Sequence, residues 1–198
     1  MIGCGRIETA LRVETMLKIN QHGYNAIREH GEETYPHECC GVLLGRSGGD
    51  SRTVEKTVRC GNTRSDSPHN RYHIAPQELV RIQRQAREAN LEIVGFYHSH
   101  PDHPARWSQT DLAEAHWIGC SYVITSVEKG TAKITNSFLL AGADEENKRF
   151  EDEVVEVAGI NPRIAYEKTA EIAREAVATG KSVTEVAGSK QLPREEST

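Results

Sequence analysis

Two histidines directly follow an apolar segment near the middle of the chain. Residues 91–97, Leu-Glu-Ile-Val-Gly-Phe-Tyr, are apolar and β-branched enough to predict a buried strand. Side chains two residues apart in a strand point to the same face, so His98 and His100 are expected to project together. Pro101 favours an extended backbone at His100, which keeps the pair aligned. The chain is therefore expected to build a sheet in which one strand ends in paired imidazoles.

A serine and an aspartate stand a few residues beyond the two histidines. Ser108 and Asp111 have the S-x-x-D spacing of a helix N-cap with an acidic residue in the first turn. This capping role is compatible with Asp111 also binding a metal. Two imidazoles and one carboxylate supply three protein ligands, the number typical of a catalytic zinc site whose fourth position is open to water.

Simpler interpretations compete with a metal site. A lone histidine is usually structural or solvated, and Ser108 with Asp111 alone would be only a helix cap. His103 is a rival third ligand, because it would complete a cluster of three histidines. It lies in a loop bracketed by prolines, where no periodicity holds it to the face of His98, so we rank Asp111 above it.

The order of these residues, with a glutamate upstream, resembles the motif of the JAMM (MPN-plus) zinc metalloproteases. Glu38 comes first and is followed by the H-x-H of His98 and His100. Seven residues then lead to Ser108, and two more lead to Asp111.

The flanking segments resemble one branch of that family, the small stand-alone bacterial proteins of the CysO-cysteine peptidase type. These segments are Tyr35–Gly45 with its Glu-Cys-Cys-Gly, Arg71–Leu79 and Gly95–Pro104. The resemblance covers residues 14–157. It implies a cytidine-deaminase-like JAMM/MPN fold of the mixed α/β class, with one curved mixed sheet flanked by helices.

The resemblance also implies a role for each residue of the motif. His98, His100 and Asp111 would hold one Zn²⁺ per chain. Glu38 would be the general base that takes a proton from water and passes it to the leaving amine. Ser108 would donate a hydrogen bond to the oxyanion of the tetrahedral intermediate.

Members of this branch remove cysteine or a peptide from the C-terminus of ubiquitin-like sulfur-carrier proteins. The resemblance therefore implies hydrolysis after a C-terminal Gly-Gly, a sulfur carrier as partner, and a place in cysteine biosynthesis. One alternative is an isopeptidase that acts on another ubiquitin-like conjugate. Another is a non-catalytic MPN-type scaffold, against which the complete motif counts.

Two cysteines beside the glutamate raise the alternative of a cysteine hydrolase. Strand alternation puts at most one of Cys39 and Cys40 on the face of Glu38. We interpret both as core residues, and a redox role for them stays open.

Composition bears on the cellular setting and the class of partner. The 198 residues suffice for one domain and an appendage, and a net charge of −5 gives no basic patch, so nucleic acid is not an expected partner. Five scattered cysteines without a CxxC favour a reducing compartment. No apolar run suits a signal peptide or a membrane span. We expect a cytoplasmic protein with no membrane partner.

Periodicity and turn residues predict alternating helices and strands. Asn20 is expected to cap a helix that ends near Thr34, and Pro76 to begin a helix that ends at Ala89. Gly45 is expected to end a strand. The predicted strands cover residues 16–19, 39–44, 53–59, 91–97, 122–127 and 132–140, with a last one near residue 154.

The chain is expected to have three parts: an N-terminal extension at residues 1–13, the metalloprotease domain at 14–157 and a helical tail at 158–198. The tail is predicted to form two helices, and it resembles the small C-terminal domain of the fumarase/aspartase family. The catalytic regions of those enzymes are absent, so lyase activity is not implied. A docking hairpin that packs on the protease domain or forms a homo-oligomer is the alternative.

Overall fold

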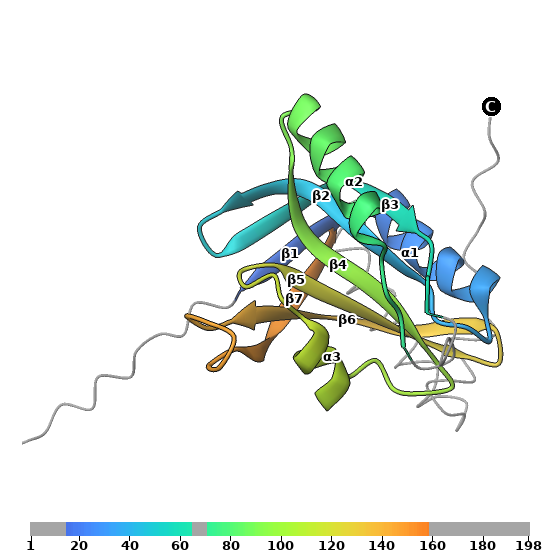
Figure 1. Cartoon of the computed structure of the whole chain (residues 1–198). Coiled ribbons are helices and arrows are strands. Elements are labelled where there is room, and N and C mark those ends of the chain that lie inside the picture. Colours follow the sequence, from blue (N-terminus) through green and yellow to red (C-terminus); the bar gives the residue numbers. More distant parts are fainter. Residues whose placement is uncertain (1–14, 65–70, 159–198) are drawn as a thin grey trace, which may run out of the picture. The chain divides into compact units, whose positions relative to one another are not determined.

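The computed structural model describes residues 15–64 and 71–158, which contain seven strands and three helices (Figure 1). The strands are β1 (Met16–Asn20), β2 (Cys40–Gly48), β3 (Ser51–Cys60), β4 (Glu92–Pro101), β5 (Ser121–Glu128), β6 (Thr131–Ala141) and β7 (Arg149–Ala158). The helices are α1 (Gln21–Thr34), α2 (Pro76–Glu88) and α3 (Gln109–Glu114).

The strands form one mixed sheet that closes on itself in the order β1-β3-β2-β4-β5-β6-β7. The short strand β1 closes it, since β1 pairs in parallel with β3 on one side and with β7 on the other. β4 lies between β2, its antiparallel neighbour, and β5, its parallel neighbour. The predicted mixed sheet with helices is confirmed. The sheet is more strongly curved than predicted, because it closes into a barrel.

Strand alternation divides the apolar side chains between two clusters on opposite faces of the sheet. Tyr97 and Val123 pack with Ile27 of α1 in one cluster. Phe96 packs in the other, which includes Ile82 of α2. Full burial of one such side chain contributes about 1.5–3 kcal/mol. Because residues two apart share a face, the histidines of β4 lie on the same side as Phe96, the side of α2.

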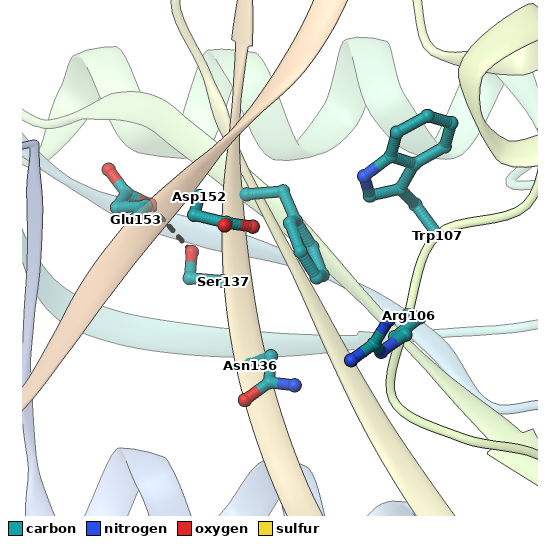
Figure 2. Close-up of a pocket in the computed structure, with 7 residues that line it drawn as sticks. Arg106, Trp107, Asn136, Ser137, Asp152 and Glu153 are labelled. Atoms are coloured by element: carbon teal, nitrogen blue, oxygen red, sulfur yellow. Dashed lines mark hydrogen bonds between the residues drawn. The ribbon is translucent and has the colours of Figure 1, made fainter.

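A buried ion pair links the two strands that flank β1. Arg52 of β3 donates from Nη1 to Glu153 of β7 at 3.0 Å, and its Nε donates to the Gly119 carbonyl at 2.8 Å. The hydroxyl of Ser137 in β6 donates to the same carboxylate, as Figure 2 shows. Removal of one partner of a buried pair typically costs about 3–5 kcal/mol. This network therefore reinforces the closure that β1 makes.

The predicted starts of both long helices and the predicted end of α1 agree with the structure, whereas α2 ends at Glu88, one residue before the predicted Ala89. The Asn20 side chain accepts a backbone N–H of the first turn at 2.7 Å, and α1 ends at Thr34. α2 begins at Pro76, where the missing N–H of proline leaves no helical hydrogen bond unmade.

The prediction that Gly45 ends a strand is wrong, because β2 continues to Gly48. The register of β2 against β3 shifts between Leu44 and Gly45, which indicates a bulge. A side chain at Gly45 would meet the backbone of Thr53 in β3, so this glycine permits a close approach of two strands. The histidine strand is also longer than predicted, since β4 includes both histidines and ends at Pro101.

The N-terminal extension and the tail after Ala158 lie outside the described residues. The helices predicted there, and the resemblance to the fumarase/aspartase family, stay predictions. Within residues 15–64 and 71–158, no helix is long and apolar enough to cross a membrane.

A substitution at Gly41 tests how closely β2 packs against its neighbouring strands. A methyl group there would collide with the Tyr97 ring and the Val58 carbonyl. We expect Gly41→Ala to lower the free energy of unfolding by about 1–3 kcal/mol. Gly48→Ala is the control in the same strand, because a methyl group there meets nothing within 4 Å. Urea unfolding of the two variants measures the difference, and equal stabilities would contradict this packing.

Candidate metal centre

The two histidines of β4 lie side by side on the face of the sheet that α2 covers. His98 pairs with Cys40 of β2 and with Ile124 of β5, and His100 pairs with Ser126 of β5, so neighbouring strands fix both backbones. The Nε2 atoms of the two rings are 3.0 Å apart, and the side chains of His98 and His100 are 2% and 11% exposed. The prediction that the two imidazoles project together is confirmed.

Asp111 reaches the same point from the first turn of α3. Its Oδ1 lies 3.3 Å from the Nε2 of His98, and its Oδ2 lies 3.6 Å from the Nε2 of His100. One ligand atom from each of the three side chains lies within 4.8 Å of the other two, and no other such group occurs in the part of the chain that the structure describes. The three residues predicted as metal ligands therefore meet.

Ser108 orients the Asp111 carboxylate through a capping box. The Ser108 hydroxyl accepts the Asp111 backbone N–H at 3.1 Å. In return, the backbone N–H and the hydroxyl of Ser108 both donate to Asp111 Oδ2, at 2.6 and 2.7 Å. The predicted cap is confirmed, and the contacts that begin α3 also hold the carboxylate beside the histidines.

The loop that joins the histidines to Ser108 is anchored on β6 and β7. The Asn136 amide donates to the Ala105 carbonyl at 2.8 Å, and the centroids of the Trp107 and Phe150 rings are 5.6 Å apart. Residues of the loop and of these strands line a cavity of about 550 Å³. Figure 2 shows Arg106 and Trp107 of the loop facing the strands. These contacts fix the distance from β4 to the start of α3, and with it the place of Asp111.

His103, the rival third ligand, is not part of the group. Its side chain is exposed. It lines a different cavity, of about 860 Å³, together with Lys129 and Lys133.

Burial and hydrogen bonding set the charge of the three grouped residues. Burial lowers the pKa of His98. Burial also acts to lower the pKa of His100, but hydrogen bonds with Asp111 and the Pro104 carbonyl raise it overall. For Asp111, burial acts upward, but hydrogen bonds with the two histidines and Ser108 hold its pKa far below the usual range. Asp111 is therefore a carboxylate at neutral pH.

Glu38 lies just before β2, two residues from the strand partner of His98, and it is 5% exposed. Burial, with smaller contributions from Asp111 and Glu114, raises the pKa of Glu38 to about 8, while His100 acts in the opposite direction. A carboxyl whose pKa lies near neutral pH can both take up and release a proton under physiological conditions.

Cys39 and Cys40 point to opposite faces of the sheet. Cys39 packs in the cluster of α1 and Cys40 in the cluster of α2, and neither is more than 2% exposed. Burial raises the pKa of Cys39 to about 12 and also raises the pKa of Cys40. A thiol that is so hard to ionise is a poor nucleophile. The interpretation of both as core residues is confirmed, which disfavours a cysteine hydrolase.

Two contacts to the histidine rings were not predicted from the sequence. The Tyr72 ring stacks on the His98 ring with centroids 4.7 Å apart, and His100 Nδ1 lies 2.9 Å from the Pro104 carbonyl. A carbonyl only accepts, so Nδ1 of His100 carries the proton and the lone pair of its Nε2 faces the group. His98 Nδ1 is buried and has no hydrogen-bond partner among the described residues. Residue type could not reveal these contacts, because one uses a ring face and the other a backbone carbonyl.

An apolar cavity of about 350 Å³ adjoins the histidines through Tyr72, which lines it. Phe96 and Trp117 also form its wall. Arg64 and Glu114 line it as well, with Arg64 Nη1 and Glu114 Oε1 3.5 Å apart. Such a mainly apolar hollow with a few polar groups is typical of a binding site.

The donor set fits a transition-metal ion. Two imidazole nitrogens and one carboxylate are the ligands of three-ligand catalytic sites with an open position. The two Nε2 atoms and the charge of Asp111 face one another at 3.0 to 3.6 Å, an arrangement that is repulsive unless a proton or a cation lies among them. The fixed tautomer of His100 directs a lone pair to this point, as a metal ligand requires.

Comparison with known proteins identifies a family. The family model described as prokaryotic homologs of the JAB domain matches residues 20–141, more than half of the chain. The desampylase of Haloferax volcanii is 39% identical over 99 residues, which cover 50% of this chain and 69% of that protein. The CysO-cysteine peptidase of Mycobacterium tuberculosis is 30% identical over 102 residues, which cover 52% of this chain and 67% of that protein.

A solved structure agrees with this assignment. The solution structure of a protein from Desulfitobacterium hafniense matches with a TM-score of 0.60 at 28% identity, covering 72% of this chain and 94% of that one. The chain therefore belongs to the prokaryotic homologs of the JAB domain, a family of JAMM-type hydrolases.

Proposed function

We propose that this chain is a zinc-dependent metallopeptidase that hydrolyses the amide bond after the C-terminal Gly-Gly of a ubiquitin-like sulfur-carrier protein and releases cysteine or a peptide. The observation that carries the proposal is the meeting of His98, His100 and Asp111 in one group, with the buried carboxyl of Glu38 close in the fold. Similarity to the mycobacterial CysO-cysteine peptidase supports the choice of substrate.

The metal in this proposal is one zinc ion per chain, held by His98, His100 and Asp111. When bound, zinc polarises a carbonyl group and lowers the pKa of water from 15.7 to about 7. The protein orients the ligands: Ser108 holds the carboxylate of Asp111, and the Pro104 carbonyl holds the tautomer of His100.

Glu38 is the general base of the proposed reaction. It takes a proton from the attacking water and delivers it to the leaving amine as the carbon–nitrogen bond breaks. A positioned base contributes about 10²- to 10⁴-fold to the rate. The burial that raises the pKa of Glu38 supports this role, because it makes the carboxylate a stronger proton acceptor.

Ser108 is the proposed oxyanion donor, and this role requires its hydroxyl to turn. A hydroxyl has one proton to donate, and here Ser108 donates it to Asp111. When the hydroxyl turns to the substrate oxyanion, the backbone N–H of Ser108 still holds Asp111 Oδ2. The capping box can therefore orient the carboxylate through both arrangements.

A flexible terminus that ends in Gly-Gly suits this site. Glycine lacks a side chain, so its backbone can approach the grouped ligands closely, and an extended segment can bind through backbone pairing. The apolar cavity beside Tyr72 could take a side chain of the substrate next to the cleaved bond. The greater identity to a desampylase favours, as a second candidate, cleavage of another ubiquitin-like conjugate.

Other parts of the proposal follow from this substrate. A role in cysteine biosynthesis, in the cytoplasm, follows if the released group is cysteine. A non-catalytic scaffold is disfavoured because the whole set of motif residues is present. The net charge of −5 gives no support to nucleic-acid binding, and measurement of the oligomeric state tests self-association through the tail.

Metal content tests the ligand assignment. Purified protein should contain about one zinc per chain, the stoichiometry of a site with three protein ligands. His98→Ala and Asp111→Ala should lose the metal, whereas the matched control His103→Ala should keep it. A chelator should abolish activity, and added zinc should restore it. Zinc retained by Asp111→Ala and lost by His103→Ala would reverse the assignment.

Glu38→Gln separates the base from the metal ligands. The amide is nearly isosteric but cannot accept the proton, so single-turnover rates should fall by about 10²- to 10⁴-fold. Zinc content and carrier affinity should stay at the wild-type level. Ser108→Ala should also react more slowly, because it lacks the hydrogen bond to the oxyanion, which stabilises the transition state by about a few kcal/mol. Wild-type turnover by Glu38→Gln would remove Glu38 from the mechanism, and loss of its zinc would make Glu38 a ligand.

Substrate specificity can be measured with a ubiquitin-like sulfur carrier that has one cysteine after its Gly-Gly. Mass spectrometry should show release of the cysteine and no further trimming. The matched control is the same carrier with Ala-Ala in place of Gly-Gly, which should react much more slowly because side chains hinder the approach. Equal rates on both carriers, or on unrelated unfolded peptides, would contradict the proposed specificity.

A further inference from the structure

The peptide unit that joins Glu38 to Cys39 is held at both ends by side chains. Its N–H, on Cys39, donates to the Ser99 hydroxyl at 2.9 Å. Its carbonyl, on Glu38, accepts a hydrogen bond from Asn62 Nδ2 at 3.3 Å. This peptide unit lies just before β2 begins. Side chains satisfy its N–H and carbonyl groups there, as backbone groups of a neighbouring strand do within a sheet.

Ser99 connects this peptide unit to β4, the strand that carries the two histidines. It lies between them in β4 and points to the opposite face, toward α1, where it is fully buried. Its backbone N–H also donates to the Cys39 carbonyl at 3.3 Å. The segment that follows Glu38 is thus tied to β4 from one side.

Asn62 ties the same peptide unit to a second part of the fold. Besides the Glu38 carbonyl, its Nδ2 bonds the Arg71 carbonyl at 3.0 Å. Its Oδ1 accepts the backbone N–H groups of Arg64 and His73, at 3.0 and 3.2 Å. A carboxamide has two N–H groups and two lone pairs, so all its capacity is used, and always on backbone groups. This pattern also fixes which amide atom is oxygen.

The segments that Asn62 joins both lead to the candidate site. Residues 71–73 include Tyr72, whose ring stacks on His98. The Glu38 carbonyl belongs to the proposed base. The half-buried side chain of Asn62 therefore holds the backbone at two places beside the histidine pair, at Glu38 and next to Tyr72.

We propose that Asn62 is a positioning residue for the reaction: it fixes the backbone of Glu38 relative to the histidine strand and so places the carboxylate for proton transfer. This inference rests on the proposed function, in which Glu38 is the general base. The bond to the Glu38 carbonyl fixes the rotation between Cα and the carbonyl carbon of that residue, and this rotation directs its side chain. A displacement of about 1 Å at a reacting group can cost about 10²-fold in rate.

Thr63 supplies a matched control from the same loop. Its hydroxyl bonds the carbonyl and Nδ1 of His73, both at 2.9 Å, and neither bond involves Glu38. Thr63→Val removes these bonds with little change in shape. It therefore loosens the same pair of segments as Asn62→Ala does, without releasing the peptide unit after Glu38.

Asn62→Asp separates the two functions of the side chain. A carboxylate can still accept the N–H groups of Arg64 and His73, but it has no N–H for the carbonyls of Glu38 and Arg71. In amide hydrogen exchange, Asn62→Ala should expose the amides of Arg64, His73 and Cys39. Asn62→Asp should expose only that of Cys39, whose bond to Ser99 depends on the orientation of the peptide unit. This measurement needs no substrate.

Turnover on the carrier with one cysteine after Gly-Gly completes the test. Both Asn62 variants should keep their zinc and a KM close to wild type, and should lose about 10- to 10²-fold in kcat. Thr63→Val should stay within about twofold of wild type, as expected for a surface contact that does not touch the site. Asn62→Asp, which keeps the acceptor bonds, provides the answer if Asn62→Ala does not fold.

Three outcomes would overturn the inference: wild-type kcat in Asn62→Asp, an equal loss in Thr63→Val and Asn62→Ala, or loss of zinc from the Asn62 variants. Glu38→Gln is measured beside them. If Glu38→Gln loses rate while the Asn62 variants do not, the inference fails and the proposed base stands. If Glu38→Gln keeps the wild-type rate, the proposed base fails and the inference falls with it.

Discussion

The candidate site depends on the position of β4 between an antiparallel and a parallel neighbour. Because β2 and β5 hydrogen-bond to it from both sides, the backbone at His98 cannot shift or twist freely, and alternation sends both imidazoles to one face. The pairing of Cys40 with His98 brings the start of β2, and with it Glu38, to the histidines. A slip of one residue would turn both rings to the face of α1.

The Asp111 carboxylate enters this frame through helix capping. A helix needs partners for its first N–H groups, and Ser108 supplies one while its own N–H holds the carboxylate in return. The cap begins α3 and orients a negative charge toward two imidazoles in the same set of contacts. The capping contact of Asp111 with Ser108 and its proposed contact with the metal are thus compatible, because they use different oxygens and lone pairs of the carboxylate.

Burial gives the residues around the histidines different properties according to their partners. Asp111 stays charged because hydrogen bonds outweigh burial, whereas burial dominates for Glu38 and raises its pKa to about 8. The buried thiols of Cys39 and Cys40 have raised pKa values and lie on opposite faces of the sheet. Two carboxyl groups in one neighbourhood, Glu38 buried and Asp111 half-buried, can therefore take the different proposed roles of proton acceptor and ligand.

Local features could be predicted from the sequence: the apolar run before His98, the H-x-H spacing, the S-x-x-D cap and the proline and asparagine at helix starts. These follow from periodicity and capping, which act over a few residues. Other features became visible only in the folded chain: β1 closes the sheet, Gly45 lies in a bulge, and Tyr72, Pro104 and Asn62 contact the site. Those contacts join residues distant in sequence or use backbone carbonyls and ring faces, so no spacing of residue types encodes them.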